Sequence, residues 1–190
     1  VIMIKDLILK NRSYRRFYEN ETIDTKTLEE LIDLARISSC AGNLQSLKYY
    51  LSNSKITNEI IFNNIKWAAY LTDFEGPEEG ERPSAYILML NDTRISKNLL
   101  WNHGIAATNI LLGAVEKGLG GCMFASVNKA AIAKELKIDE VYDIVMVIAL
   151  GKPKEIVKLD PMTNNNVKYY RDENQVHHVP KRELKDIIVK

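Results

Sequence analysis

The spacing of apolar residues along the chain predicts helices that alternate with strands. Apolar side chains three and four positions apart predict helices over residues 4–10, 59–70, 98–118 and 128–136. Apolar runs rich in β-branched or aromatic residues predict strands over residues 47–51, 85–90 and 144–150, and a further strand begins within residues 118–126. Because no internal repeat or linker divides the sequence, we expect a single domain over residues 1–190.

Another helix follows the first one and opens at residues 24–27. Thr27 and Glu30 have the spacing of a capping box at its start. Helical spacing gives this helix an apolar face, which is made of Leu28, Leu31, Ile32 and Ala35. We expect that face to be buried in the core.

The helix over residues 98–118 is apolar almost all round in its middle. A helix of this kind is buried on all sides. In a chain of 190 residues, part of that burial is expected to come from a second subunit. The alternative is a central helix buried wholly within one monomer.

Two segments are expected to be irregular. Residues 72–83, here called the acidic loop, contain four glutamates, two glycines and two prolines. Residues 158–179 are polar and show no clear period. Lys181 and Arg182 then precede a last short helix.

Composition narrows the class of protein. The net charge of +1 favours neither nucleic-acid binding nor binding to an anionic membrane surface. Cys40 and Cys122 fit no metal-site spacing and no disulfide framework. The longest apolar segment, residues 105–115, is too short to span a bilayer, and the first residues do not resemble a signal peptide. A cytoplasmic protein without a metal is therefore expected.

The strongest chemical signal is residues 11–17, N-R-S-Y-R-R-F, here called the basic stretch. Arg12, Arg15 and Arg16 surround the hydroxyl of Ser13 closely enough to repel one another unless an anion lies between them. Arginine suits a planar or phosphate-like anion because its fork donates two parallel hydrogen bonds. The alternative is a solvated basic turn that Phe17 anchors to the core.

A second candidate is residues 40–45, C-A-G-N-L-Q, here called the amide loop. Its small residues let the backbone approach a ligand, and its two amides offer donors and acceptors. The alternative is an ordinary turn between a helix and a strand, with Gly42 as the helix cap. The glycines of residues 118–121 do not have the spacing of a dinucleotide fingerprint, and there is no P-loop.

Four stretches together resemble the nitroreductase family of FMN-dependent flavoenzymes. The basic stretch is similar to the family's R-R-S-x-R-x-F, and residues 39–47, S-C-A-G-N-L-Q-S-L, are similar to P-S-x-x-N-x-Q-P-W. Residues 118–125, G-L-G-G-C-M-F-A, resemble G-L-G-S-C-W-I-G, and residues 181–184 resemble the basic pair near the family's C-terminus. The motifs occur in the family's order and cover nearly the whole chain.

The resemblance implies an α+β fold with an antiparallel-rich central sheet flanked by helices. It also implies an entwined homodimer with an FMN at each of two sites in the interface. The implied reaction passes electrons from NADH or NADPH, through N5 of the flavin, to a nitroaromatic, a quinone or a similar small oxidant. Dehalogenation, flavin fragmentation and FMN storage without turnover are the alternatives. No side chain is expected to be catalytic, because the flavin carries the chemistry.

The resemblance also implies roles for individual residues. Arg12 and Ser13 would bind the FMN phosphate together with Lys181 or Arg182, and Arg15 would lie near the pyrimidine edge of the flavin. The family's other two contact regions match Cys40, Ala41, Asn43 and Gln45, from the partner subunit, and the backbone of Phe124, Ala125 and Ser126. Lys66 is a further, weaker match.

The sequence departs from the family's motifs at several positions. Asn11 replaces an arginine, which leaves the phosphate site with one charge fewer. Ser39 and Cys40 replace proline and serine, and Ser46 and Leu47 replace the proline and tryptophan behind the loop.

Overall fold

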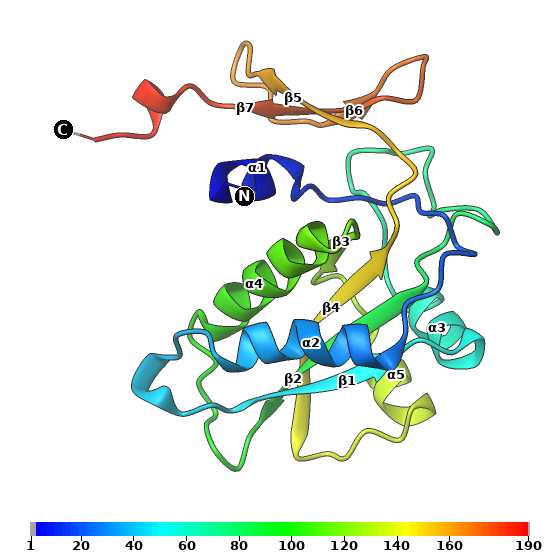
Figure 1. The fold of residues 1–190 in the computed structure, drawn as a ribbon, viewed down its shortest axis with the longest axis vertical. Coiled ribbons are helices and arrows are strands. Elements are labelled where there is room, and N and C mark those ends of the chain that lie inside the picture. Colours follow the sequence, from blue (N-terminus) through cyan, green and yellow to red (C-terminus); the bar gives the residue numbers. More distant parts are fainter. Residues whose placement is uncertain (1–2, 190) are drawn as a thin grey trace.

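The computed structural model describes residues 3–189. Its centre is an antiparallel sheet with the strand order β1-β2-β4-β3, which confirms the expected α+β class (Figure 1). The strands are β1 (Leu47–Ser52), β2 (Ala85–Asp92), β4 (Tyr142–Gly151) and β3 (Gly120–Phe124). β2 and β4 are the inner strands and are almost wholly apolar, as strands covered on both faces must be.

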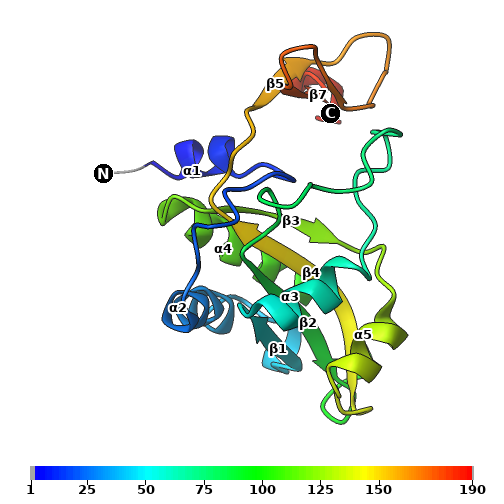
Figure 2. The same ribbon diagram turned by 90° about the vertical axis from the view of Figure 1, so that its right-hand side faces the viewer.

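Helices cover both faces of the sheet (Figure 2). α2 (Thr25–Arg36) and α4 (Asn102–Glu116) pack on one face, and α3 (Lys55–Phe62) and α5 (Lys129–Glu135) pack on the other. Successive side chains of a strand point to opposite faces. In β2 the odd-numbered residues, such as Ile87, belong to the core cluster of α2 and α4, and the even-numbered ones, such as Leu88, belong to that of α3 and α5.

The ends of the chain lie together beyond one end of this sandwich. α1 (Ile4–Lys10) has no buried residue, and a small second sheet lies above it in Figure 1. That sheet consists of β5 (Val157–Pro161), β6 (Tyr170–Arg171) and β7 (His177–Lys181), with β7 in the middle. Two 3₁₀ turns complete the described elements, η1 (Ala41–Asn43) and η2 (Leu184–Asp186).

Several sequence-based boundaries were wrong. The helix expected over residues 59–70 is α3, which starts earlier because the Ser54 hydroxyl caps it by accepting from the backbone N–H of Thr57. It ends at Phe62 because Ile65 pairs with Val127 as a β-bridge. At α2, Asp24 rather than Thr27 is the N-cap.

The C-terminal prediction also needs correction. Residues 158–179 were expected to be irregular, yet they contain β6 and most of β5 and β7. The expected final helix is only the single turn η2.

α4 is shorter than the helix expected over residues 98–118 and begins at Asn102. Its inner positions, among them Ala107 and Ile110, are fully buried, whereas Ile105 and Leu112 remain half-buried. Gly118, at φ +74°, ends the helix and turns the chain into β3. Across residues 3–189, no helix combines the length and the apolar character that a bilayer crossing requires.

Candidate functional site

The basic stretch runs along the outer edge of β3. The backbone N–H of Tyr14 donates to the carbonyl of Gly121 at 3.0 Å, and Ser13 forms a parallel bridge with Gly121. Gly120 makes this approach possible, since a Cβ there would lie 2.5 Å from the Tyr14 ring. Phe17 anchors the end of the stretch with a fully buried ring packed on Gly151. The family's first and third motifs are therefore side by side.

Arg12 and Arg15 each keep a buried donor unused. Nη2 of Arg12 donates to the Ile8 carbonyl at 2.8 Å, at the end of α1. Nη1 of Arg15 donates to the Ser13 carbonyl at 3.3 Å. Nε of both arginines is buried and has no hydrogen-bond partner within residues 3–189. Buried donors normally have partners, so these two atoms are suited to an acceptor that binds from outside the chain.

The Arg15 side chain is held by the C-terminal sheet. Its guanidinium lies 4.8 Å from the ring centre of Tyr169 and 3.3 Å from Nε2 of His177. A guanidinium only donates, so Nε2 accepts and the proton of the neutral ring lies on Nδ1. Burial, with the charges of Arg15 and Arg171 nearby, lowers the pKa of His177 to about 4. His177 is therefore a neutral acceptor that adds no second positive charge beside Arg15.

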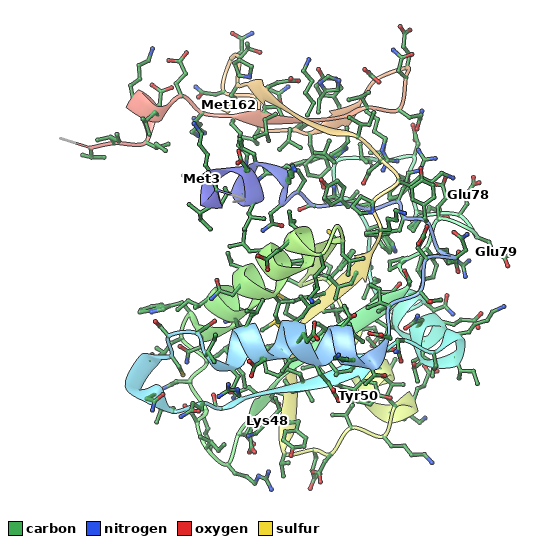
Figure 3. All side chains as sticks on the ribbon, in the orientation of Figure 1. Met3, Lys48, Tyr50, Glu78, Glu79 and Met162 are labelled. Carbon is green, nitrogen blue, oxygen red and sulfur yellow. The ribbon has the colours of Figure 1, made fainter. Side chains whose placement is uncertain are left out.

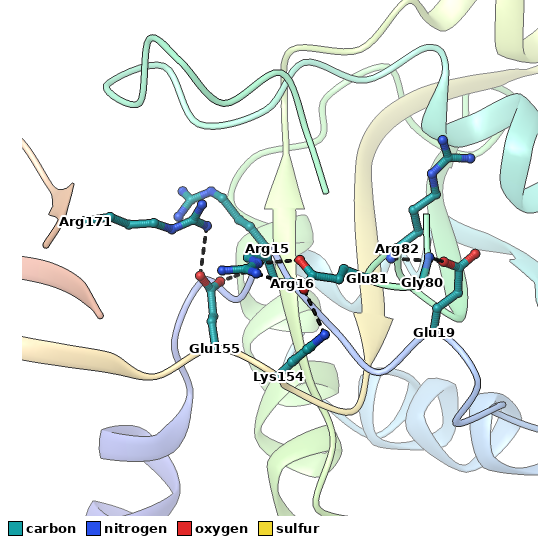
Figure 4. A network of polar contacts seen from close by, with 9 residues as sticks. All are labelled: Arg15, Arg16, Glu19, Gly80, Glu81, Arg82, Lys154, Glu155 and Arg171. Atoms are coloured by element: carbon teal, nitrogen blue, oxygen red, sulfur yellow. Dashed lines mark hydrogen bonds and ion pairs between the residues drawn. The ribbon is translucent and has the colours of Figure 1, made fainter. Parts of the chain in front are cut away.

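Glu155 is the buried carboxylate beside this cation. It accepts from the backbone N–H of Arg15 and, at 2.9 Å, from Nη2 of Arg171 (Figure 4). Sequence reasoning missed Glu155, Tyr169 and His177. All three come from the C-terminal part of the chain, and no local pattern linked them to the basic stretch.

Arg16 points elsewhere and ties the basic stretch to the acidic loop. Its Nη2 donates to the Glu81 carboxylate at 2.8 Å, and Lys154 also reaches Glu81 at 2.9 Å (Figure 4). The hydrogen bond from Arg16, together with that from Lys154, lowers the pKa of the Glu81 carboxyl to about 2. Glu78 and Glu79 instead project at the edge of the molecule (Figure 3). The acidic loop is therefore fixed at one glutamate and solvated at others.

The three residues expected to face the flavin ring lie at and just beyond the end of β3, and they differ in exposure. Phe124 is buried, packs 4.7 Å from Trp67 between ring centres and pairs with Val147 of β4. Ala125 and Ser126 are exposed. The Ser126 carbonyl accepts from the backbone N–H of Lys66 at 3.0 Å, which brings the weakly matched Lys66 beside this motif.

The alternation of backbone polar groups along β3 refines this assignment. The outward carbonyl of Gly121 bonds Tyr14, so the polar groups of Met123, two residues on, point to the same outer edge. Those of Phe124 point inward to β4. Met123 therefore presents its backbone at this edge in place of Phe124.

The amide loop lies at the far end of α4 from the basic stretch. The backbone N–H of Ala41 donates to the Asn102 side chain at 2.8 Å, at the start of α4. α4 has 15 residues, so its ends are about 22 Å apart. The loop holds Asn43 and Gln45 exposed at positive φ, and the Cys40 sulfur accepts from the Gln45 N–H. One chain does not bring this loop to its own basic stretch.

Lys181 is the last residue of β7 and Arg182 follows it, and both are exposed. Arg182 donates to the side chain of Asn165 at 2.9 Å. Lys181 is four residues, about 13 Å of strand, beyond His177. In the part of the chain that the structure describes, no hydrogen bond or ion pair joins either residue to Arg12 or Ser13.

The sequence matches the model of a known protein family. That family model, described as "Nitroreductase family", covers residues 8–152. The chain belongs to the nitroreductase family. The matched residues include the basic stretch, the amide loop and β3, whereas Lys181 and Arg182 lie outside them.

Individual nitroreductase relatives are distant. YodC of Bacillus subtilis (strain 168), whose name assigns it provisionally to the NAD(P)H nitroreductases, is 25% identical and the match covers 77% of this chain and 88% of YodC. A nitroreductase family protein from Streptococcus pneumoniae TIGR4 has the same fold, with a TM-score of 0.71, 17% identity and coverage of 99% and 100% of the two chains. A nitroreductase-like protein from Exiguobacterium sibiricum 255-15, solved in complex with FMN, gives a TM-score of 0.69, 14% identity and coverage of 82% and 90%.

Proposed function

We propose that this nitroreductase family protein is an FMN-dependent oxidoreductase that works as a homodimer. NADH or NADPH would be the electron donor, and a nitroaromatic, a quinone or a similar small molecule the acceptor. The FMN-bound relative and the name of YodC support the cofactor and the donor. The cytoplasmic location stays a prediction.

The observation that carries the proposal is the pair of buried, unpartnered Nε donors on Arg12 and Arg15. They lie on either side of the exposed Ser13, on a segment that follows the edge of β3. Two guanidiniums and a hydroxyl suit a terminal monophosphate with the adjoining polar edge of a flavin. Lys181 or Arg182 would complete the phosphate site.

FMN, when bound, supplies hydride transfer at N5. The chain's own residues would bind and orient it. Arg12 and Ser13 would hold the phosphate, and the positive charge of Arg15 would face the pyrimidine edge. The exposed edge of β3 at Met123, with Ala125 and Ser126, would lie along the ring. His177 is neutral above about pH 4 and therefore adds no second positive charge beside Arg15.

The distance along α4 supports the homodimer. The amide loop is about 22 Å of helix from the basic stretch of the same chain, so Cys40, Ala41, Asn43 and Gln45 reach the site only from the partner subunit. Exposed apolar side chains on α1, such as Ile4 and Ile8, supply a surface that association would cover.

The experiment that tests the proposal starts from the purified protein. Flavin released by acid should elute as FMN rather than FAD. Anaerobic stopped-flow mixing with NADH and with NADPH should then bleach the flavin band within seconds. FAD as the main flavin, or no flavin after incubation with FMN, would overturn the cofactor assignment. Bound FMN that neither nucleotide reduces would favour a storage protein.

A further inference from the structure

A row of three polar side chains leads into β2 on the α3 side of the sheet. Arg82, Ser84 and Tyr86 are two residues apart, and Tyr86 belongs to the even-numbered set of β2 that faces α3 and α5. Arg82 and Ser84 precede β2 in a bent segment, so their direction follows from the cavity that they line rather than from strand alternation. All three line one cavity of about 480 Å³.

The floor of this cavity is polar at one end and apolar beside it. Phe62, at the end of α3, and the buried Pro83 supply the apolar wall. Asn58 also lines the cavity, but its amide is occupied, since Nδ2 donates to the Ser84 carbonyl at 2.9 Å and Oδ1 accepts from Ser52. The row supplies polar groups that are both buried and free, whereas Thr22, Asn53 and Lys55 line the cavity with polar groups nearer its mouth or on its rim.

Each residue of the row has a buried polar atom without a partner. Nε of Arg82, the Ser84 hydroxyl and the Tyr86 hydroxyl are all buried and form no hydrogen bond within residues 3–189. Tyr86 is 1% exposed and Ser84 is 8% exposed. Buried polar groups in native proteins are nearly always paired, so three orphans around one cavity require an explanation. All three can donate, which indicates a ligand that accepts hydrogen bonds.

The charges around the cavity select a monoanion. Arg82 stacks on Phe62 at 4.3 Å, and its guanidinium forms no ion pair within the described residues 3–189; it lies apart from the ion pairs of Figure 4. Glu19 is nearby, but its carboxylate already accepts from the backbone N–H groups of Gly80 and Arg82. Glu59 and Glu79 on the rim are exposed and would repel a dianion. The cavity is thus lined by two cations, Arg82 and the exposed Lys55, which favour an anion, and by the carboxylates of Glu19, Glu59 and Glu79, which disfavour more than one negative charge on it.

We propose that this cavity binds a small monocarboxylate with an apolar body. The carboxylate would accept from Arg82, Ser84 and Tyr86, and the apolar body would pack on Phe62 and Pro83. Arg12, Ser13 and Arg15, which carry the proposed FMN site, do not line this cavity. The inference is thus independent of the proposed oxidoreductase activity.

The test is a titration of the full chain followed by amide NMR, with benzoate as the probe. Benzamide has the same shape without the charge, and inorganic phosphate has charge without the apolar body. Benzoate should saturate, with shifts at residues 53–62 and 82–86. Benzamide and phosphate should bind at least about 10-fold more weakly, as expected for the loss of a charge-assisted hydrogen bond or of the apolar contact.

Three substitutions connect the binding to the row. Ser84→Ala and Tyr86→Phe should each weaken benzoate binding by about 10-fold, and Arg82→Gln by more. The exposed Arg36 and Tyr170 provide matched controls, since Arg36→Gln and Tyr170→Phe remove the same groups far from the cavity. Thermal unfolding without ligand separates binding from structure. Ser84→Ala and Tyr86→Phe should not lower the midpoint, because the hydroxyls that they remove have no partner in the chain.

Three results would each overturn the proposal. They are benzoate shifts confined to other residues, benzoate and benzamide binding equally, and Tyr86→Phe lowering the unfolding midpoint while benzoate affinity stays unchanged.

Discussion

At the scale of single residues, neighbouring arginines of the basic stretch have different surroundings. Arg15 contacts Tyr169 and His177, whereas Arg16 pairs with Glu81. Within residues 3–189, the Arg12 side chain hydrogen-bonds the Ile8 carbonyl in the last turn of α1 and no other group. The order of charges along the sequence therefore does not by itself say which of them is available to a ligand.

Arg12→Ala should weaken FMN binding and leave the fold intact. A hydrogen bond to a charged group is worth roughly 1.5–3 kcal/mol, so the dissociation constant should rise by about 10- to 150-fold. Fluorescence titration of the flavin-free protein with FMN measures the effect, and circular dichroism checks the fold. An unchanged dissociation constant would identify Arg12 as a structural cap of α1.

Arg15→Gln should lower the reduction potential of the bound flavin. Reduction places negative charge near the pyrimidine edge, and unit charges about 4 Å apart interact by roughly 4 kcal/mol at an effective dielectric near 20. Delocalisation and partial solvation reduce this to about 1–2 kcal/mol, which corresponds to a fall of about 20–45 mV. A dye-equilibrated redox titration provides the measurement.

Arg16→Gln is the matched control for that measurement, because Arg16 points to the acidic loop. It should leave the potential unchanged. A shift in Arg16→Gln alone would mean that the register of the basic stretch on the flavin is displaced by one residue.

At the scale of elements, Glu81 fixes the acidic loop to the basic stretch. Glu81→Gln should lower the free energy of unfolding by roughly 1.5–3 kcal/mol, because a paired carboxylate is lost. It should also speed amide exchange in residues 72–83. Glu78→Gln makes the same change at an exposed position of that loop and should do neither.

The pKa of Glu81 gives that contact a pH dependence. Its folded pKa, about 2, lies below its ordinary value of 4.5. The stabilisation is therefore complete above pH 4.5 and is lost as the pH falls towards 2. Equal exchange in the Glu81→Gln and Glu78→Gln variants at neutral pH would show that the ion pair does not hold the loop.

His178 should give the C-terminal sheet a pH dependence of the opposite sign. Hydrogen bonds to Asp160 and Asp172 raise its pKa above the ordinary 6.5. A raised pKa means stabilisation that is complete below pH 6.5 and is lost as the pH rises through the folded pKa. After correction for intrinsic exchange, amides of residues 157–181 should lose protection with rising pH, and His178→Asn should remove that dependence.

The sequence predicted the elements whose burial gives a clear pattern of apolar residues. It missed the elements that form only by pairing with residues distant in the sequence. The apolar runs of β2 and β4 are continuous because both faces of these strands are covered. In β7, Pro180 and two histidines give no strand signal, and this strand is ordered by pairing with β5 on one side and β6 on the other. At the site, the basic stretch and the amide loop were visible as local patterns. The contacts of Arg15 with Glu155 and His177 span at least 140 residues of sequence.

At the scale of the whole molecule, α1 presents apolar side chains that a partner subunit would cover. Met3, Ile4, Ile8 and Leu9 are each between 49% and 62% exposed. Ile8→Asp should therefore convert a dimer into a monomer and reduce FMN content, since the amide loop of the partner would be absent. Light scattering with the flavin-to-protein absorbance ratio measures both.

Ile56→Asp is the control for that substitution. Ile56 is 75% exposed on α3, on the opposite face of the sheet. This variant should remain a dimer with its full FMN content. A wild-type chain that is monomeric at micromolar concentration and still holds FMN would contradict the assembly.

The length of α4 has a genetic consequence. If the amide loop of one subunit serves the basic stretch of the other, defects in the two segments can complement each other. Asn43→Gly removes an amide while tolerating the positive φ of that position. In a heterodimer of an Arg12→Ala chain with an Asn43→Gly chain, one site carries both defects and the other carries neither. At an FMN concentration too low to saturate either variant, mixing the two proteins and allowing their subunits to exchange should then raise the activity, because the intact site binds FMN.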